Sequence, residues 1–423
     1  MEFVIVWVIG LVQFQPYNEL VLIGSADILH KLINPFTNRH DSGNKVNKEE
    51  SIEALVELER KAFQYDTLVT ATRNFSEKLG EGGFGPVFKG QLEDGREVAV
   101  KRLAVGSRQG ENQFANEASL LSGVQHKNVV HLYGFCIHGA DRLLVYEYVA
   151  NESLDKILFA CSNDCPKRAE LNWQRRYSIM LAVVKGLLYL HEGTQTPIIH
   201  RDIKAANILL DQRWVPKIAD FGMARLFPED ESHVNTRVAG TNGYMAPEYL
   251  MHGCLSPKAD VYSFGVVVLE LVTGCRCHPF VPLPGTDAKN LLEWAWKLYK
   301  EGRVLEMVDP EIRPNLDLDQ VSTCVHIGLL CTQAEPRRRP DMRRINIIFP
   351  KKPSTLEEPS RPGIPGRRYT SRYHLTTGTG TLDSSRNSSS SSGSGTGSSS
   401  YSTSASTSAS ASASSSKGKG LQL

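Results

Sequence analysis

The sequence is poor in cysteine, in excess charge and in long apolar runs. Its 423 residues include eight cysteines, without a repeated Cys-x-x-Cys pair or accompanying histidines. This pattern argues against a zinc site and against a disulfide framework, so reduced thiols in a cytosolic compartment are the simpler interpretation. The formal net charge is only +2, which argues against the strongly basic face of a nucleic-acid-binding protein.

The apolar run at the N-terminus is too short to predict a membrane span. Residues 3–14 are nearly all apolar, but a bilayer requires roughly 20 such residues. Residue 2 is Glu, so the basic start of a signal peptide is missing, and no lipidation motif stands at either end. We expect an intracellular, cytoplasmic protein. Peripheral association with the inner face of the plasma membrane stays open, without a clear anchor.

Composition divides the chain into three regions. Residues 1–62 combine the short apolar segment with a polar linker, and residues 63–349 are dense in apolar residues and glycine. Residues 350–423 are rich first in proline and then in Ser, Thr, Gly and Ala. Such a tail buries too little to offset the entropy of ordering, so we expect it to be disordered.

The middle region changes from strand patterns to helix patterns. Short β-rich runs flank Asp94-Gly95, a strong hairpin signal. Further along, Ile179, Val183, Leu187 and Leu190 recur at helical spacing. We therefore predict an α+β fold with two lobes: a small β-rich lobe at about 63–149 with one helix, and a larger helical lobe at about 150–349.

A glycine-rich stretch opens the small lobe. Gly80-x-Gly82-x-x-Gly85 allows the backbone to approach phosphates closely, but dinucleotide-binding folds use the same pattern. In those folds the glycines open a helix, whereas here Pro86 and Val87 lead into a strand. The stretch is therefore predicted to be a β-turn-β flap over phosphates, and an ordinary glycine hairpin is the alternative.

A lysine and a glutamate follow at a fixed spacing. Lys101 ends the apolar strand Val98-Ala99-Val100, where its ammonium can reach α- and β-phosphates. Sixteen residues later, Glu117 falls in a helical stretch at about residues 112–121, suitably placed to orient Lys101 by an ion pair. Taken singly, each would be interpreted as a surface charge.

Three more motifs complete the set. In His200-Arg201-Asp202, the carboxylate of Asp202 is placed to accept or orient a hydroxyl proton, and Asn207 supplies a neutral oxygen to a divalent cation. Asp220-Phe221-Gly222 supplies a second metal ligand, and Ala246-Pro247-Glu248 closes the segment that follows. Chance does not explain five such motifs in this order.

Over about residues 75–349 the sequence resembles the eukaryotic protein kinase family. The resemblance implies a phosphotransferase that uses ATP with Mg²⁺ or Mn²⁺ and acts on protein substrates. The catalytic residues it implies are Asp202, Lys204 and Asn207, with Asn207 and Asp220 on the metal. The nucleotide-binding residues it implies are Leu79, Gly80, Glu81, Gly82, Gly83, Phe84, Gly85, Val87, Ala99, Lys101, Glu117, Glu147 and Val149.

The resemblance extends to structural duties. Tyr146 corresponds to the gatekeeper behind the adenine pocket, with backbone groups of Glu147 and Val149 on adenine. Asp260 is expected to brace the catalytic loop, and Arg339 to pair with Glu248.

The branch within the family follows from a few positions. Lys204 and Thr241 resemble the serine/threonine branch. Asn151-Glu152-Ser153-Leu154 and Thr241-Asn242-Gly243-Tyr244 resemble cysteine-rich receptor-like kinases of the plant Pelle-related group. With only about 62 residues before the domain, we expect a receptor-like cytoplasmic kinase, served by an upstream receptor kinase.

Two further expectations concern activity and its control. A pseudokinase scaffold is the rival interpretation. Such proteins usually lose the strand lysine, the catalytic aspartate or the metal aspartate, and here Lys101, Asp202 and Asp220 are all present. A membrane receptor is disfavoured for want of an ectodomain. Arg201 before Asp202 resembles kinases controlled by a phosphate on the activation segment, and we expect that phosphate on Thr236, since Thr241 is committed to Asp202.

Overall fold

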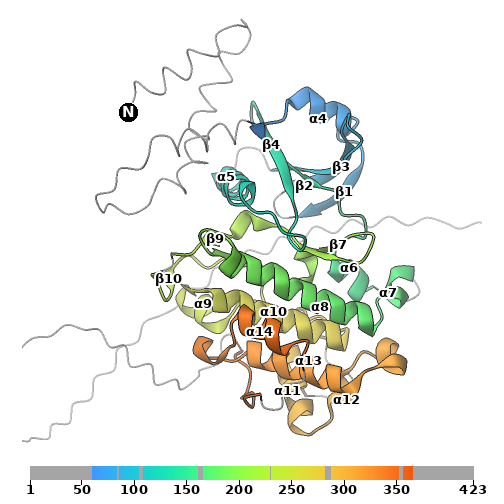
Figure 1. The fold of residues 1–423 in the computed structure, drawn as a ribbon, viewed down its shortest axis with the longest axis vertical. Helices are drawn as coiled ribbons and strands as arrows, with labels where there is room; N and C mark the ends of the chain where they lie inside the picture. Colours follow the sequence, from blue (N-terminus) through green and yellow to red (C-terminus); the bar gives the residue numbers. More distant parts are fainter. Residues whose placement is uncertain are drawn as a thin grey trace, which may run out of the picture. The chain divides into compact units, whose positions relative to one another are not determined.

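The computed structural model describes residues 60–82, 85–103, 108–160, 165–228, 230–281, 287–351 and 356–364. All of them lie in one compact unit. Figure 1 shows a small lobe built on a sheet and a larger lobe built mainly of helices. The predicted α+β fold with two lobes is confirmed. Nearly all of the predicted N-terminal extension and most of the predicted tail lie outside the described residues.

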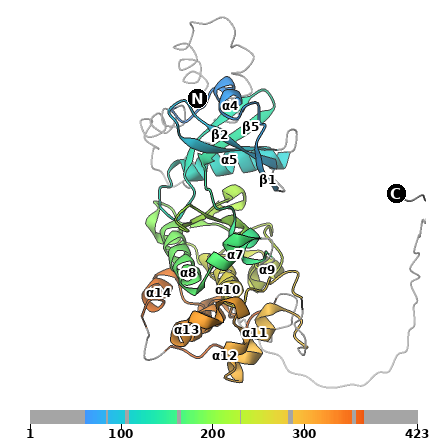
Figure 2. The ribbon, with the colours of Figure 1, turned by 90° about the vertical axis from the view of Figure 1, so that its right-hand side faces the viewer.

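An antiparallel sheet of order β1-β2-β3-β5-β4 forms the small lobe. Its strands are β1 (Lys78–Gly82), β2 (Gly85–Gln91), β3 (Glu97–Arg102), β4 (Leu132–His138) and β5 (Asp141–Glu147). The hairpin predicted at Asp94-Gly95 is confirmed, and Gly95 has φ +83°, a conformation that suits glycine. Figure 2 shows α4 (Tyr65–Ala71) and α5 (Arg108–Ser122) on opposite sides of this sheet.

Alternation along β3 decides where Lys101 lies. Val98 and Val100 are buried in a small cluster with Leu68 of α4, so by the two-residue period of a strand Ala99 and Lys101 face the other side. Ala99 packs against the main core, which continues into the larger lobe. The strand pattern therefore directs the lysine toward the space between the lobes.

The larger lobe contains nine named α-helices within the described residues. They are α6 (Leu154–Leu158), α7 (Pro166–Glu170), α8 (Trp173–Leu188), α9 (Pro247–His252), α10 (Pro257–Thr273), α11 (Leu291–Lys300), α12 (Val304–Met307), α13 (Leu318–Cys331) and α14 (Met342–Ile348). Short strand pairs sit between α8 and α10: β6 (Ile198–Ile199) with β9 (Arg225–Leu226), β7 (Ile208–Leu210) with β8 (Pro216–Ile218), and β10 (Val234–Asn235) with β11 (Cys254–Leu255). The residues predicted to share a helical face are all buried, on α8 and the π-helical turn that follows it.

The central helix α10 is buried all round and mainly apolar, as a helix in a core should be. The Ser256 side chain caps its first turn by accepting from the Lys258 N–H, and Gly274 ends it with φ +67°. A Cβ at Gly265 would come within 2.6 Å of Cys331 Cβ, so this glycine allows α13 to pack closely. No helix in the described part of the chain combines the length and apolarity needed to cross a bilayer.

The ordered chain continues past the boundary that we predicted at residue 349. Residues 356–364, which the sequence assigned to a disordered tail, pack on the larger lobe, and we call them the strap. Gln333 Nε2 donates to the Ser360 carbonyl, and Tyr262 Oη donates to the Gly363 carbonyl, at 2.8 and 2.6 Å. Proline excluded a regular element here but did not exclude packing.

Deletion of residues 384–423 is expected to leave the melting temperature of the folded domain unchanged, because that stretch offers no apolar surface to bury. Differential scanning fluorimetry of the full and shortened chains checks this. A drop of more than ~2 °C, about a kcal/mol or less for a domain of this size, would contradict it. As a positive control, deletion from residue 356 onward, which removes the strap, should lower the melting temperature by about 4 °C or more.

Candidate active site

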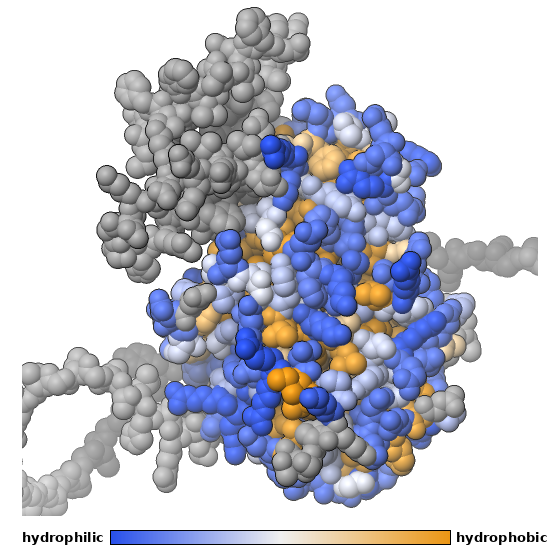
Figure 3. All heavy atoms as spheres, in the orientation of Figure 1, coloured by the Kyte–Doolittle hydropathy of each residue, from blue (hydrophilic) through white to orange (hydrophobic). Residues whose placement is uncertain are grey.

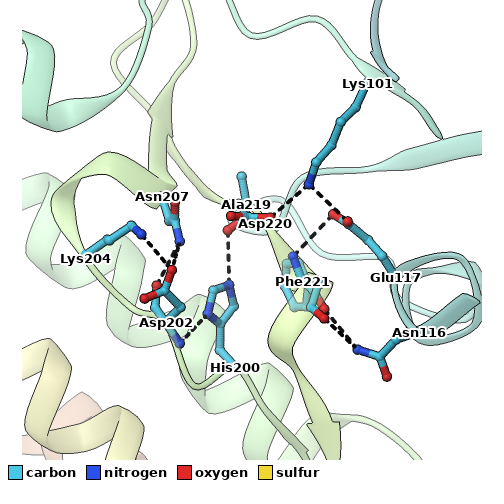
Figure 4. Close-up of polar contacts among 11 residues, drawn as sticks. Lys101, Asn116, Glu117, His200, Asp202, Lys204, Asn207, Ala219, Asp220 and Phe221 are labelled. Atoms are coloured by element: carbon cyan, nitrogen blue, oxygen red, sulfur yellow. Dashed lines mark hydrogen bonds and ion pairs between the residues drawn. The ribbon is translucent and has the colours of Figure 1, made fainter. Parts of the chain in front are cut away.

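Three charged side chains meet between the lobes. Lys101 Nζ lies 3.1 Å from Glu117 Oε2 on α5 and 2.9 Å from Asp220 Oδ1, as Figure 4 shows. Burial acts to lower the pKa of Lys101, but the two carboxylates outweigh it and raise that pKa. The lysine is therefore charged and held in place, as the spacing of Lys101 and Glu117 predicted.

The carboxylate of Asp202 is held from several sides. Lys204 Nζ donates to its Oδ2 at 2.7 Å, and Thr241 Oγ1 donates to its Oδ1 at 2.6 Å. Asn207 Nδ2 donates to Asp202 Oδ2 at 3.0 Å, which leaves the amide oxygen of Asn207 for another partner. The four residues that the sequence singled out thus lie together around one carboxylate.

A buried aspartate fixes the loop that carries Asp202. Asp260 of α10 accepts from the backbone N–H groups of His200 and Arg201, at 2.8 and 2.9 Å. Its Oδ2 also lies 3.0 Å from His191 Nε2, a contact the sequence did not predict. Burial acts to raise the pKa of Asp260, but the His191 contact prevails and the pKa is lowered. Arg201 is thereby held at φ +72°, a strained value for a non-glycine residue.

Asp220 is also held in a left-handed conformation, with φ +70° and ψ +72°. Phe221 beside it is fully buried and meets the His200 ring edge-on at 4.7 Å between centroids. Asn116 Nδ2, on α5, donates to the Ala224 carbonyl at 2.8 Å. The sequence analysis missed Asn116, because no motif includes it and only the adjacent Glu117 stands at a recognisable spacing.

Most of the predicted nucleotide-binding residues lie on strands of the small-lobe sheet. Those that the structure describes on β1, β2, β3 and β5 are Leu79, Gly80, Glu81, Gly82, Gly85, Val87, Ala99 and Glu147. Gly83 and Phe84 lie outside the described residues. Gly80 and Gly82 have open space where a Cβ would stand, and the Val149 N–H makes no hydrogen bond within the described residues. Tyr146 is buried behind this edge.

Arg201 contacts the activation segment at several points. The Arg201 guanidinium donates to Tyr249 Oη at 2.6 Å and to the carbonyls of Arg237 and Met223, at 2.8 and 3.1 Å. Tyr249 was not predicted to take part, although it directly follows Ala246-Pro247-Glu248. The predicted pair is present at the end of the segment, where Arg339 donates to both Glu248 oxygens at 2.7 Å.

A second buried carboxylate supports the end of this segment. The Tyr244 hydroxyl donates to both oxygens of Glu270, at 2.9 and 3.0 Å, and the Cys277 N–H donates at 2.8 Å. Burial raises the pKa of Glu270 to about 7, against the effect of the bonds from Cys277 and Tyr244. The sequence did not single out this cluster, because its members come from three separate segments.

We expect Glu270 to make stability depend on pH. Its folded-state pKa of about 7 lies above the ordinary value of 4.5, so its contribution is full below pH 4.5 and is lost as pH rises through 7. Relative to Glu270→Gln, the wild type should lose on the order of 2–3 kcal/mol of unfolding free energy between pH 5 and 8. Urea unfolding at several pH values measures this, with exposed Glu335→Gln as the matched control. Parallel curves for wild type and Glu270→Gln would contradict the assignment.

The residues present fit a divalent cation bound together with phosphates. Asp220 and Asn207 offer a carboxylate and an amide oxygen, the hard ligands that Mg²⁺ takes when phosphates and water complete its shell. Within the described ranges no group of three or more His, Cys, Asp or Glu side chains forms a metal cage of its own. The site therefore suits a metal that is bound with the nucleotide.

Comparison with known proteins agrees with this geometry. A family model described as protein tyrosine and serine/threonine kinase matches residues 73–349. Cysteine-rich receptor-like protein kinase 10 of Arabidopsis thaliana is 51% identical over 305 residues, which cover 71% of this chain and 45% of that protein. A probable LRR receptor-like serine/threonine-protein kinase of the same plant is 50% identical over 304 residues, 71% of this chain and 29% of that protein.

A third similar protein, putative cysteine-rich receptor-like protein kinase 33 of the same plant, is 47% identical over 310 residues, 72% of this chain and 48% of its own length. The chain thus spans less than half the length of these curated relatives. Since the matched region holds Lys101, Asp202 and Asp220 in the arrangement described above, the chain belongs to the protein tyrosine and serine/threonine kinase family.

Proposed function

We propose that this chain transfers the γ-phosphate of ATP to serine and threonine hydroxyls of proteins. Kinases of this family use ATP with a divalent metal ion. The observation that carries the proposal is the arrangement of Lys204 and Thr241 on the two oxygens of Asp202. This arrangement supports the proposal because the Lys204 cation would lie beside the transferring phosphate, and Asp202 would keep its carboxylate toward the substrate hydroxyl.

The chemistry we propose uses few groups. Asp202 orients the substrate hydroxyl and takes its proton, while the hydroxyl oxygen bonds to the γ-phosphorus and the bond to the leaving ADP oxygen breaks. Lys204 neutralises negative charge that spreads over the transferring oxygens. Thr241 keeps Asp202 in one rotamer, so the geometry is set before the substrate arrives.

At the other end of the nucleotide, Lys101 is proposed to bind the α- and β-phosphates while Glu117 orients it. Asn207 and Asp220 would hold Mg²⁺, which offsets phosphate charge when bound; Mn²⁺ is the alternative ion. The Val149 N–H is free within the described residues to donate to adenine.

Phosphoamino acid analysis tests the proposal. Purified chain incubated with labelled ATP and a generic protein substrate should yield phosphoserine and phosphothreonine, and the Asp202→Asn variant should yield neither. Phosphotyrosine as the main product would contradict the hydroxyl specificity. A wild-type protein that binds ATP but transfers no phosphate, even after an upstream kinase has acted on it, would favour the scaffold interpretation.

We also propose control by phosphorylation of Thr236. Its backbone N–H donates to the Gly253 carbonyl at 3.0 Å. The next residue, Arg237, accepts a hydrogen bond from Arg201 through its carbonyl, so Thr236 lies beside the Arg201 contacts. A phosphate would add ~1.5 to 2 negative charges and form one to three charge-assisted bonds. We expect kcat of dephosphorylated protein to be low but not zero, and Thr236→Ala to stay at that level after incubation with ATP. Equal kcat for Thr236→Ala and autophosphorylated wild type would contradict this switch.

The setting we propose is intracellular signalling. None of the seven cysteines within the described residues is in a disulfide, and proteins of a reducing compartment keep their thiols in this form. Two similar proteins are named as receptor-like kinases of the cysteine-rich type. An upstream receptor kinase as activator, and a place at the inner face of the plasma membrane, are therefore the partners and location to test first.

A further inference from the structure

A hollow of about 650 Å³ lies on the larger lobe, away from the proposed catalytic residues. Residues 127–128, the outer side of α8 and the β7–β8 turn at 212–216 line it, and we call it the α8 groove. Helix α8 contacts β8, the strand that pairs with β7, and Figure 1 shows α8 on the side of the molecule that faces the viewer. Over α8, the surface in Figure 3 mixes hydrophilic and hydrophobic residues.

The α8 groove carries an excess of positive charge. Lys127, Lys185 and Arg213 are exposed, and none of the three forms an ion pair with a carboxylate among the described residues. Arg175 is paired with Glu170 at 2.8 Å. Four cations therefore face one carboxylate, which favours an acidic occupant.

The walls of the groove are already in place. The Asn172 side chain caps α8 by accepting from the Arg175 N–H, and the Arg175 guanidinium lies over the Trp214 ring at 4.4 Å. Asp211 Oδ1 accepts from the N–H groups of Arg213 and Val215, each at 2.8 Å, and so fixes the turn. Binding here would require little ordering of the groove itself.

A segment of this same chain matches the groove in charge. Residues 49–59, Glu-Glu-Ser-Ile-Glu-Ala-Leu-Val-Glu-Leu-Glu, contain five glutamates and no lysine or arginine. Glu49, Glu53 and Glu57 recur every four residues, with Ile52 and Val56 at the same spacing. This pattern gives an acidic face and an apolar face if the segment is helical.

The chain directly after the segment is bonded to a residue close in sequence to one that lines the groove. The segment ends at Glu59. Arg60 and Lys61 follow it, and Lys61 Nζ donates to the Ser122 carbonyl, five residues before Lys127. Residues 49–59 can span ~16 Å as a helix and about 36 Å when extended. The stretch of α8 from Arg175 to Lys185 extends for about 15 Å, so the segment is long enough in either form to cover the groove.

We propose that residues 49–59 dock in the α8 groove as an intramolecular ligand, with their glutamates on Lys127, Lys185 and Arg213. Single exposed ion pairs contribute little, but covalent linkage holds the segment at an effective concentration in the millimolar range. Several weak ion pairs are then enough to keep the segment docked. Because the pairs are exposed, the docked state should weaken as ionic strength rises.

Hydrogen exchange on the full chain tests the proposal. In wild type at low salt we expect amides of residues 212–215 to exchange about tenfold more slowly than in a variant with Glu49, Glu53 and Glu57 changed to Lys. Lys185→Glu with Arg213→Glu should lose the same protection. Combining the two sets of changes should restore it, and Lys297→Glu, at an exposed position of α11, should have no effect.

Zero-length carbodiimide cross-linking identifies the occupant. We expect links from glutamates of residues 49–59 to Lys127 or Lys185 within one chain, decreasing with added NaCl. Links that join isotopically labelled to unlabelled chains would assign the groove to a second copy and overturn the intramolecular proposal. Equal amide exchange at residues 212–215 in wild type and both charge-reversed variants would overturn the docking itself.

Discussion

Asp220→Asn is expected to abolish phosphotransfer, with a loss of at least about 100-fold in kcat. The carboxylate of Asp220 lies 2.9 Å from Lys101 Nζ, and burial is outweighed there by Lys101, which lowers the pKa of Asp220. The group is therefore an anion at neutral pH. An asparagine keeps the shape but removes the charge that would hold the metal on the phosphates.

Steady-state kinetics with Mg²⁺ measures this loss, with Asp66→Asn on α4 as a control that also removes one carboxylate. Lys101→Met should lose activity as well, because the phosphate contact disappears. Both variants should keep the wild-type circular dichroism spectrum, since neither change removes core packing. More than about a tenth of wild-type activity in Asp220→Asn would refute the metal assignment, because metal clamps contribute several kcal/mol.

Arg339→Met is expected to destabilise the fold by on the order of 3–5 kcal/mol. Arg339 is 2% exposed, and it donates to both oxygens of Glu248 as well as to the carbonyls of Gln333 and Lys258. Removing the guanidinium leaves a largely buried carboxylate and several carbonyls without donors, and such losses are among the costliest single changes.

Urea unfolding measures the effect, and the exposed pair of Arg344 with Glu357 supplies the control. Arg344→Met should cost less than about 1 kcal/mol. If Arg339→Met gives no soluble protein, Arg339→Lys should still fold but lose stability, because an ammonium cannot replace the fork of two parallel bonds. A change within 1 kcal/mol for Arg339→Met would show that the pair is not a structural anchor.

Sequence patterns predicted the parts of the site that lie on fixed spacings. Lys101, Glu117, Asp202 and Asp220 are recognisable because a strand end, a helix face and two short loops each restrict which residue can stand there. The ion pair between Lys101 and Glu117 and the hydrogen bonds to the Asp202 carboxylate then follow from the fold. The catalytic roles of these residues stay predictions, which the kinetic experiments address.

Other contacts could not be predicted because they depend on side chains from distant segments. Tyr249 and Asn116 donate or accept across gaps of 48 and 108 residues along the chain. The strap was missed for a different reason, since it binds through backbone carbonyls and turns rather than through an amphipathic pattern. The predicted boundaries of the N-terminal extension and of the remaining tail stay predictions.

The guanidinium of Arg201 has a further consequence for how the enzyme would process a signal. Its partners are neutral oxygens, and bonds to charged acceptors are roughly twice as strong. An incoming phosphate would therefore exchange partners rather than fill an empty position, and the free energy it contributes is only the difference between the two sets of bonds. The unmodified enzyme would therefore keep some activity, and phosphorylation would raise that activity by a limited factor. Total activity would then be graded with the fraction of molecules modified.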